Sequence, residues 1–220
     1  RCVNSVLGGL IGPKCLVYLD DILVFGEDEG TFVKNLQEVL HRLAEVNLLL
    51  NYDKCQIGMR EVKYLGFIVN SHGRRIDPDR IQNLRDMKGP SRVKGVQKLV
   101  GSINFLRQFI PDYSRMAEPI PRLLSSKSKE IVWGSEQKET WETILESLEK
   151  RLTISHIQEE GELILRTDAS TFGIGGVLLQ KQEDREGLIN LFSRKFTKTE
   201  QRWTTIEQEA KEVYRRDRSP

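Results

Sequence analysis

The sequence has 220 residues, of which 38% are hydrophobic and 30% charged, and its net charge is +2. This composition indicates a globular protein of one or two domains with enough apolar surface for a real core. No apolar run approaches the roughly 18 residues of a membrane span, and no signal peptide opens the chain. We therefore expect neither membrane insertion nor secretion.

The first residue is Arg rather than Met, so we expect the chain to be an excerpt of a longer sequence. The three cysteines, Cys2, Cys15 and Cys55, are odd in number and form no CxxC pair. Such spacing does not favour a disulfide framework, and it indicates a reducing compartment.

Residues 1–13 are expected to form the end of a helix and a turn. An apolar run follows from Cys15 to Gly26, and it contains two adjacent aspartates, Asp20 and Asp21. The β-branched, aromatic and aliphatic flanks predict two short buried strands, so Asp20 and Asp21 are expected in the turn of a tight hairpin. Negative charge beside so much apolar surface costs free energy, and a bound cation commonly offsets this cost. Magnesium takes one or two carboxylates and completes its shell with phosphates and water. The pair therefore predicts metal-dependent phosphoryl or nucleotidyl transfer, and the alternative is a turn that merely happens to be Asp-Asp.

Residues Phe32–Leu50 carry apolar residues at helical spacing, which predicts an amphipathic helix on the sheet of the hairpin. Its expected apolar stripe consists of Val33, Leu36, Val39, Leu40, Leu43, Val46 and Leu50. Residues Glu61–Asn70, followed by Ser71-His72-Gly73, predict a second hairpin. Within it Gly66 is expected to mark a close approach of the backbone.

Two helices are predicted next: Asp77-Pro78-Asp79 opens the first, and Gly89-Pro90-Ser91 closes it and caps the second, which ends at Pro111. The second helix is expected to carry one apolar stripe, formed by Val96, Leu99, Val100, Ile103, Leu106, Phe109 and Ile110. From Arg74 to Lys129 there are thirteen basic residues against five acidic ones, between acidic flanks. A basic middle of this kind favours binding of a polyanion, and the alternative is an ordinary solvated helix pair. The basic residues on this second helix that we expect to contact a polyanion are Lys94, Lys98 and Arg107.

After a polar joint at 125–129, Trp133–Leu152 is predicted to be a helix, and three strands in a meander follow within 163–193. A final helix is predicted from about Thr204 to Arg215. Asp168 ends the first of these strands, and the last helix offers Glu207 and Glu209. A strand-end Asp facing a helical Glu would be half of a two-metal hydrolase site, although such residues also serve as turn formers and solvated surface. The glycines at 173–176 are not followed by Lys-Ser/Thr, which excludes a P-loop.

The chain as a whole resembles one family, the reverse transcriptase and ribonuclease H region of the Pol polyproteins of gypsy-type LTR retrotransposons. The similar blocks occur in family order: Tyr18-Leu19-Asp20-Asp21 (the YxDD hairpin), Tyr64-Leu65-Gly66-Phe67 (the primer grip), residues 100–111 (the thumb helix), Trp133 with its acidic helix (the connection), Thr167-Asp168-Ala169-Ser170 and residues 203–210 (ribonuclease H). The resemblance implies an α+β fold with a palm remnant at 1–74, a thumb at 75–125, a connection at 126–160 and a truncated ribonuclease H-like α/β domain at 161–220.

The resemblance also implies roles. Asp20 and Asp21 would be catalytic metal ligands of the polymerase, and Asp168 and Glu209 would hold the metal ions of ribonuclease H, with Mg²⁺ as cofactor or Mn²⁺ in its place. Tyr18, Leu65 and Gly66 would contact nucleic acid together with the basic helix. The implied partners are an RNA or DNA template–primer, an RNA–DNA hybrid, deoxynucleoside triphosphates and the rest of the polyprotein, and the implied location is intracellular, in a cytoplasmic particle or the nucleus.

Departures from the family pattern qualify these expectations. An earlier palm Asp and the later ribonuclease H ligands do not occur in the sequence, and Arg215–Pro220 does not continue the pattern. We therefore expect little activity from this polypeptide alone. The alternatives are a decayed or recruited nucleic-acid-binding protein without catalysis and, more remotely, an unrelated metal-binding α/β protein.

Overall fold

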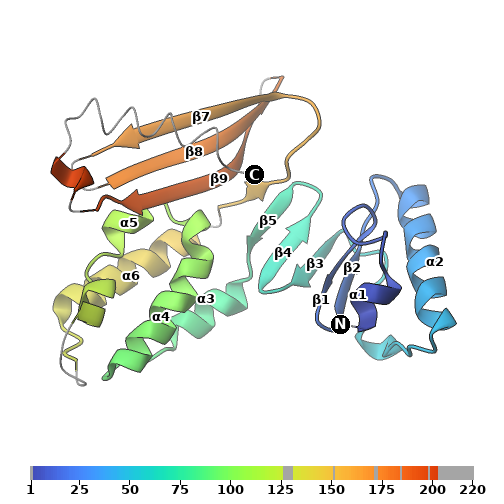
Figure 1. Cartoon of the computed structure of the whole chain (residues 1–220), viewed down its shortest axis with the longest axis horizontal. Helices are drawn as coiled ribbons and strands as arrows, with labels where there is room; N and C mark the ends of the chain where they lie inside the picture. Colours follow the sequence, from blue (N-terminus) through green and yellow to red (C-terminus); the bar gives the residue numbers. More distant parts are fainter. Residues whose placement is uncertain are drawn as a thin grey trace. The chain divides into compact units, whose positions relative to one another are not determined.

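The computed structural model describes residues 2–125, 131–150, 152–170, 173–183, 185–197 and 199–202. The chain divides into two compact units, residues 1–59 (unit 1) and 60–220 (unit 2), which Figure 1 colours along the sequence. The finer boundaries expected at 74/75, 125/126 and 160/161 stay a prediction. The final helix expected from Thr204, with Glu207 and Glu209, lies outside the described residues.

Unit 1 is a hairpin packed against helices. Its elements are α1 (Cys2–Val6), β1 (Cys15–Tyr18), β2 (Asp21–Val24), α2 (Glu29–Glu45) and the 3₁₀ turn η1 (Tyr52–Lys54). The strands β1 and β2 pair antiparallel, and one face of the hairpin joins α1 and α2 in a small core formed by Leu7, Leu10, Cys15, Val39 and Leu43. The opposite face is open, so the strands expected to be buried are buried only in part: Leu16 is 42% exposed.

The helix α2 begins and ends earlier than the expected span of 32–50. Asp28 caps it by accepting a hydrogen bond from the Thr31 amide at 2.9 Å, which satisfies a free donor of the first turn. Asn47 follows with a left-handed φ of 55°, which ends the helix. Asn35, rather than the expected Val33, is buried, and its side-chain amide donates to the Phe25 carbonyl at 2.8 Å.

Unit 2 combines a four-stranded sheet, a group of helices and a three-stranded sheet. Its elements are β3 (Glu61–Tyr64), β4 (Phe67–Asn70), β5 (Gly73–Ile76), α3 (Pro78–Arg85), α4 (Val93–Leu106), η2 (Arg107–Phe109), α5 (Tyr113–Met116), η3 (Pro121–Ser125), α6 (Ser135–Glu149), β6 (Ile154–Ser155), β7 (Glu162–Ala169), β8 (Gly173–Gln182), β9 (Arg185–Lys195) and η4 (Glu200–Arg202). The first sheet has the order β3-β4-β5-β6 and the second the order β7-β8-β9, and all their pairings are antiparallel. The predicted second hairpin and the predicted meander are thus confirmed, whereas β6 was not expected.

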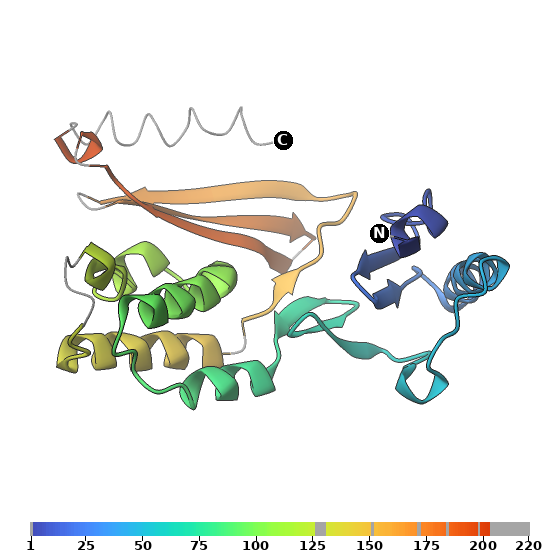
Figure 2. The same cartoon turned by 60° about the horizontal axis from the view of Figure 1, so that its bottom comes forward.

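The core of unit 2 lies among the helices. The apolar stripe predicted on the second helix is buried, and so is that of α6: the fully enclosed side chains include Val96, Ile103, Leu106, Phe109, Ile144 and Leu145. These residues form one cluster with Phe67 and Ile76 of the first sheet, and Leu188 of β9 packs against it. In Figure 2 the sheet β7–β9 lies on the side of α4 and α5, where β9 contacts α5 and η2. One continuous core therefore supports both sheets.

The buried phenol of Tyr113 gives this core a measurable pH dependence. Its hydroxyl donates to Asn104 Oδ1 at 2.8 Å, and burial raises the pKa of Tyr113 to about 12. An unfolded phenol has a pKa of about 10, so its neutral form contributes full stability below pH 10. Between about pH 10 and 12 only the unfolded chain loses this proton, and we expect the stability of unit 2 to fall. Urea unfolding at several pH values should show a shallower fall in Tyr113→Phe, and equal slopes in the two proteins would contradict this assignment.

Candidate functional site

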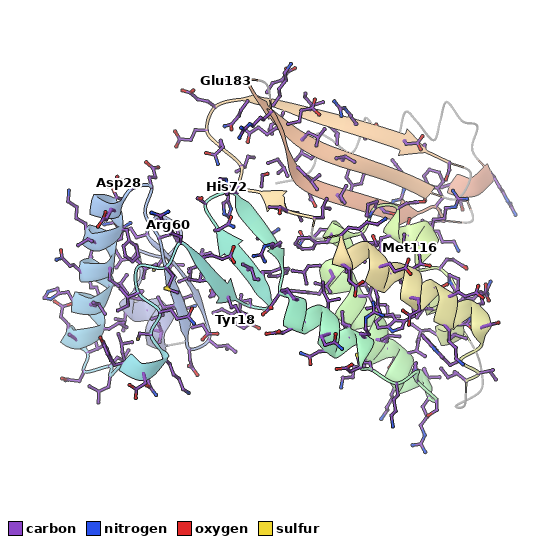
Figure 3. All side chains as sticks on the ribbon, turned by 180° about the vertical axis from the view of Figure 1, so that it is seen from behind. Tyr18, Asp28, Arg60, His72, Met116 and Glu183 are labelled. Atoms are coloured by element: carbon purple, nitrogen blue, oxygen red, sulfur yellow. The ribbon has the colours of Figure 1, made fainter. Side chains whose placement is uncertain are left out.

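The tip of the β1–β2 hairpin presents the two adjacent aspartates. Tyr18 pairs with Asp21, so the two-residue turn consists of Leu19 and Asp20, and Asp21 is already the first residue of β2. The predicted hairpin is confirmed, but the expectation that both aspartates lie in the turn is wrong by one residue. Leu19 has a left-handed φ of 54° and is 77% exposed, and Tyr18, labelled in Figure 3, is 53% exposed at the same end of the hairpin.

A left-handed Leu is unusual because the branched side chain crowds the backbone in that region. Among the described residues only two aliphatic side chains adopt it, Leu19 and Leu65, and each opens the turn of a predicted functional hairpin. Backbone outliers of this kind concentrate at functional sites, where the surrounding structure holds them in place. The two turns are therefore the first places to look for function.

Both carboxylates at the tip are exposed, and neither has a hydrogen-bond or ion-pair partner within the described ranges. The expectation that apolar surroundings make their charge costly is not met. The donor set fits Mg²⁺ nevertheless, since this ion takes one or two carboxylates and leaves its other positions to water and phosphate oxygens. In the part of the chain that the structure describes, no cluster of three His, Cys, Asp or Glu side chains could enclose a metal ion by itself.

The second turn, Leu65–Gly66, joins β3 to β4 in unit 2, and both residues have left-handed φ values, 53° and 79°. Two consecutive left-handed residues characterise a tight hairpin turn. The predicted close approach at Gly66 is confirmed, because a Cβ there would lie 2.3 Å from Arg80 Nη1. Asp20 and Asp21 belong to unit 1, whereas Leu65 and Gly66 belong to unit 2.

Two of the three basic residues predicted on the second helix lie on α4, and the third lies directly after it. Lys94 and Lys98 lie one turn apart on α4, and Arg107 begins η2. All three side chains are exposed, and none forms an ion pair with an acidic residue in the described ranges. Their charge is thus available to a polyanion.

Asp168 lies near the end of β7, where it pairs with Gly175 of β8 and borders a cleft of about 670 Å³. The cleft lies between the sheet and α5, and because Gly175 has no side chain the space in front of the strand stays open. Its charged lining is balanced in sign: Asp112, Glu118 and Asp168 against Arg115, Arg166 and Lys195. Glu209, the predicted second acid, lies outside the described residues, so the structure places only Asp168 of that pair.

The docking of β9 on α5 closes one side of this cleft. The Ser114 amide donates to Ser193 Oγ at 2.8 Å, and Lys195 Nζ lies 3.1 Å from Glu118 Oε1. Sequence reasoning missed α5, a four-residue helix behind Pro111 and a left-handed Asp112. No periodicity can be read from so short an element.

Two families match different parts of the chain. Residues 1–69 match the family described as reverse transcriptase (RNA-dependent DNA polymerase), and residues 133–215 match the RNase H-like domain found in reverse transcriptase. No helix in the described ranges is long and apolar enough to cross a membrane.

Curated relatives extend the similarity over nearly the whole chain. The retrovirus-related Pol polyprotein from transposon opus of Drosophila melanogaster is 33% identical over 219 residues, which cover 95% of this chain and 22% of the relative. The transposon Tf2-3 polyprotein of Schizosaccharomyces pombe is 29% identical over 208 residues, covering 94% of this chain and 16% of the relative. The chain therefore spans about a fifth of the length of these relatives.

Solved structures agree with these relatives. The foamy viral protease–reverse transcriptase in complex with double-stranded DNA matches with a TM-score of 0.82 and 26% identity, over 97% of this chain and 38% of that one. The foamy viral enzyme in complex with an RNA/DNA hybrid matches with a TM-score of 0.81 and 26% identity, over 97% of this chain and 29% of that one.

Proposed function

Because the chain belongs to the reverse transcriptase and RNase H-like region of LTR-retrotransposon Pol polyproteins, we propose that it contributes to RNA-directed DNA synthesis by two-metal nucleotidyl transfer in the whole protein. The observation that carries the proposal is the hairpin tip beside the left-handed Leu19, where the Asp20 and Asp21 carboxylates are exposed and have no hydrogen-bond or ion-pair partner among the described residues. Such a tip offers two carboxylates on a stiff support, which suits shared coordination of Mg²⁺ with the phosphates of a nucleotide.

The remaining parts take their roles from this proposal. Residues 1–74 would be the end of the palm, 75–125 the thumb, 126–160 the connection and 161–220 a ribonuclease H-like domain. Tyr18 would lie near the primer terminus, and Leu65 and Gly66 would contact the primer strand. Asp168 and Glu209 would hold metal ions for hydrolysis of the RNA strand of a hybrid. Mg²⁺, or Mn²⁺ in its place, would lower the barrier by stabilising charge on the attacking and leaving oxygens.

The proposal includes the ligands and the location. Two of the similar foamy viral structures were determined with double-stranded DNA and with an RNA/DNA hybrid, and we propose the same classes of nucleic acid, with deoxynucleoside triphosphates, for this chain. Cys15 and Cys55 are free thiols, which supports an intracellular location in a cytoplasmic particle or the nucleus.

Primer extension on an RNA template tests the polymerase proposal. The test protein is a chimera in which these 220 residues replace the matching region of the opus polyprotein, and this chain alone is assayed beside it. We expect extension by the chimera and little by the chain alone. A chimera that binds template–primer but does not extend it would instead support a recruited or decayed nucleic-acid-binding protein.

Replacing Lys94, Lys98 and Arg107 together with Ala should weaken binding of this chain to duplexes of any sequence. Three fewer phosphate contacts release fewer counterions, so the slope of log affinity against log salt should decrease in magnitude by about 2 to 3. Fluorescence anisotropy with a labelled RNA–DNA duplex at several salt concentrations measures both effects.

The matched control removes the same charge elsewhere, through Lys138→Ala, Lys150→Ala and Lys181→Ala. These side chains are also exposed and without an ion pair in the described ranges. We expect the control to keep most of the affinity and of the salt slope. Equal losses in the two triple variants would show that net charge alone, and not the surface of α4 and η2, attracts the duplex.

A further inference from the structure

The Leu65–Gly66 turn is tied to the start of α3 through both of its carbonyl groups. The Asp77 amide donates to the Gly66 carbonyl at 3.1 Å, and Arg80 Nη1 donates to the Leu65 carbonyl at 3.2 Å. Asp77 is the N-cap of α3 and Arg80 lies in its first turn. The conformation of the turn therefore depends on the beginning of a helix whose N-cap lies eleven residues after Gly66.

Arg80 reaches the turn only because residue 66 has no side chain. A Cβ on Gly66 would lie 2.3 Å from Arg80 Nη1 and 3.1 Å from its Cδ, so a side chain there would displace the guanidinium from the turn. The same glycine supplies the left-handed φ of 79° that the turn requires. Gly66 thus serves the turn twice, through its backbone conformation and through the space it leaves.

The same guanidinium also lies over an aromatic ring of α4. Arg80 Cζ is 4.4 Å from the centroid of Phe105, and the Phe105 ring stacks on Phe67 with centroids 5.3 Å apart. A planar guanidinium at this distance from a ring is attracted to its π face. Arg80 therefore connects three elements: the turn after β3, the helix α3 and the end of α4.

The Arg80 and Arg85 guanidinium groups of α3 lie in different electrostatic surroundings. No carboxylate lies within ion-pair distance of it in the described ranges, whereas Arg85 on the same helix pairs with Glu142 and Glu149. Partial burial lowers the pKa of Arg80, yet a guanidinium stays charged at any ordinary pH. A partly buried cation without an acidic partner is costly, so the Leu65 carbonyl and the Phe105 ring are the contacts that stabilise the guanidinium in this place.

We propose that Arg80 is a positioning residue that holds the Leu65–Gly66 turn against Phe105, so that the turn and α4 present one fixed surface to a nucleic-acid duplex. The inference rests on the proposed function for its duplex, but the clamp itself is a property of this chain. A planar fork is essential to it, because one group must bond a carbonyl and cover a ring at the same time. Lys keeps the charge and lacks the fork.

The first measurement is amide hydrogen exchange of the 220-residue chain, read at the Asp77 amide that donates to Gly66. In Arg80→Gln we expect exchange about tenfold faster, since a charge-assisted hydrogen bond and a cation–π contact are lost. In Arg80→Lys the Asp77 amide should exchange nearly as fast as in Arg80→Gln. Arg85→Gln is the matched control on the same helix, and its exchange at Asp77 should be unchanged. Equal exchange in Arg80→Gln and Arg85→Gln, or full rescue by Lys, would overturn the clamp.

The second measurement is affinity for a labelled RNA–DNA duplex. Arg80→Gln and Arg80→Lys should both bind about tenfold more weakly, and Arg85→Gln within about twofold of the unmodified chain. If Arg80→Gln lowers the affinity for the duplex but Arg80→Lys does not, Arg80 acts through its charge alone, and the positioning role is overturned. If the unmodified chain binds no duplex, the proposed binding of nucleic acid at this surface is wrong, and the turn and α4 present no surface to a duplex. The exchange data still show whether Arg80 holds the Leu65–Gly66 turn in place.

Discussion

Primer extension by the chimera should fall about a thousandfold when Asp20 becomes Asn. The substitution keeps the size of the side chain and removes its negative charge, which is the property that a magnesium ligand supplies. Loss of one carboxylate from a site that stabilises transferring phosphate is worth several kcal/mol, and about 4 kcal/mol corresponds to a thousandfold in rate. Extension is measured in single turnovers on an RNA template at saturating Mg²⁺.

The matched control for this experiment is Glu27→Gln. Glu27 follows β2, is exposed and also belongs to unit 1, so its substitution removes the same charge from the same part of the chain. We expect extension to stay within about twofold of the unmodified chimera, as is usual for exposed surface residues. Asp20→Asn with undiminished extension would remove the basis of the polymerase proposal, because no metal ligand at the tip would then be required.

The helices of unit 2 show what a periodic pattern predicts well. The stripe of α4 and the stripe of α6 are buried as the sequence indicates, since each helix packs between other elements of a continuous core. The same reasoning was right only in part on α2, where Val39 and Leu43 of the expected stripe are buried but Leu40 and Val46 are exposed and Asn35 is buried. The periodicity of a sequence predicts that a helix has an apolar stripe. Which residues of that stripe are buried also depends on the area of the surface against which the helix packs, here the β1–β2 hairpin.

The candidate site was predictable in kind but not in detail. Asp and Asn favour turns and Leu disfavours a left-handed backbone, so local preference places Asp20 and Asp21 together in the turn. The register of β1 and β2 instead puts Leu19 there and moves Asp21 into a strand. Pairing of whole strands overrides the preference of one residue, and the strain that results is itself the sign of a special position.

The role of Arg80 could not be found from the sequence at all. The Asp77-Pro78 pair correctly predicts where α3 begins, but it says nothing of which carbonyl the following arginine reaches. The contact with Leu65 and the stack on Phe105 join residues fifteen or more positions apart. Such long-range contacts come from tertiary packing, which local patterns do not encode.

Leu106→Ala should lower the free energy of unfolding of unit 2 by about 3 to 4 kcal/mol. Leu106 is fully enclosed at the end of α4, so its truncation loses transfer free energy and leaves a cavity that a close-packed core closes only in part. The control is Leu163→Ala on β7, which removes the same atoms from a side chain that is 51% exposed and should cost about 1 kcal/mol or less. Urea unfolding followed by tryptophan fluorescence measures the difference, since all three tryptophans lie in unit 2.

This substitution also tests whether the two sheets of unit 2 share one core. Leu106 lies in the cluster that includes Phe67 of the first sheet and against which Leu188 of β9 packs. Amide exchange in β8 should therefore accelerate to the same extent as the tryptophan transition shifts. Protection in β8 that persists after the helices have unfolded would mean that β7–β9 fold independently, and the docking of β9 on α5 would then be a contact between two separately stable bodies.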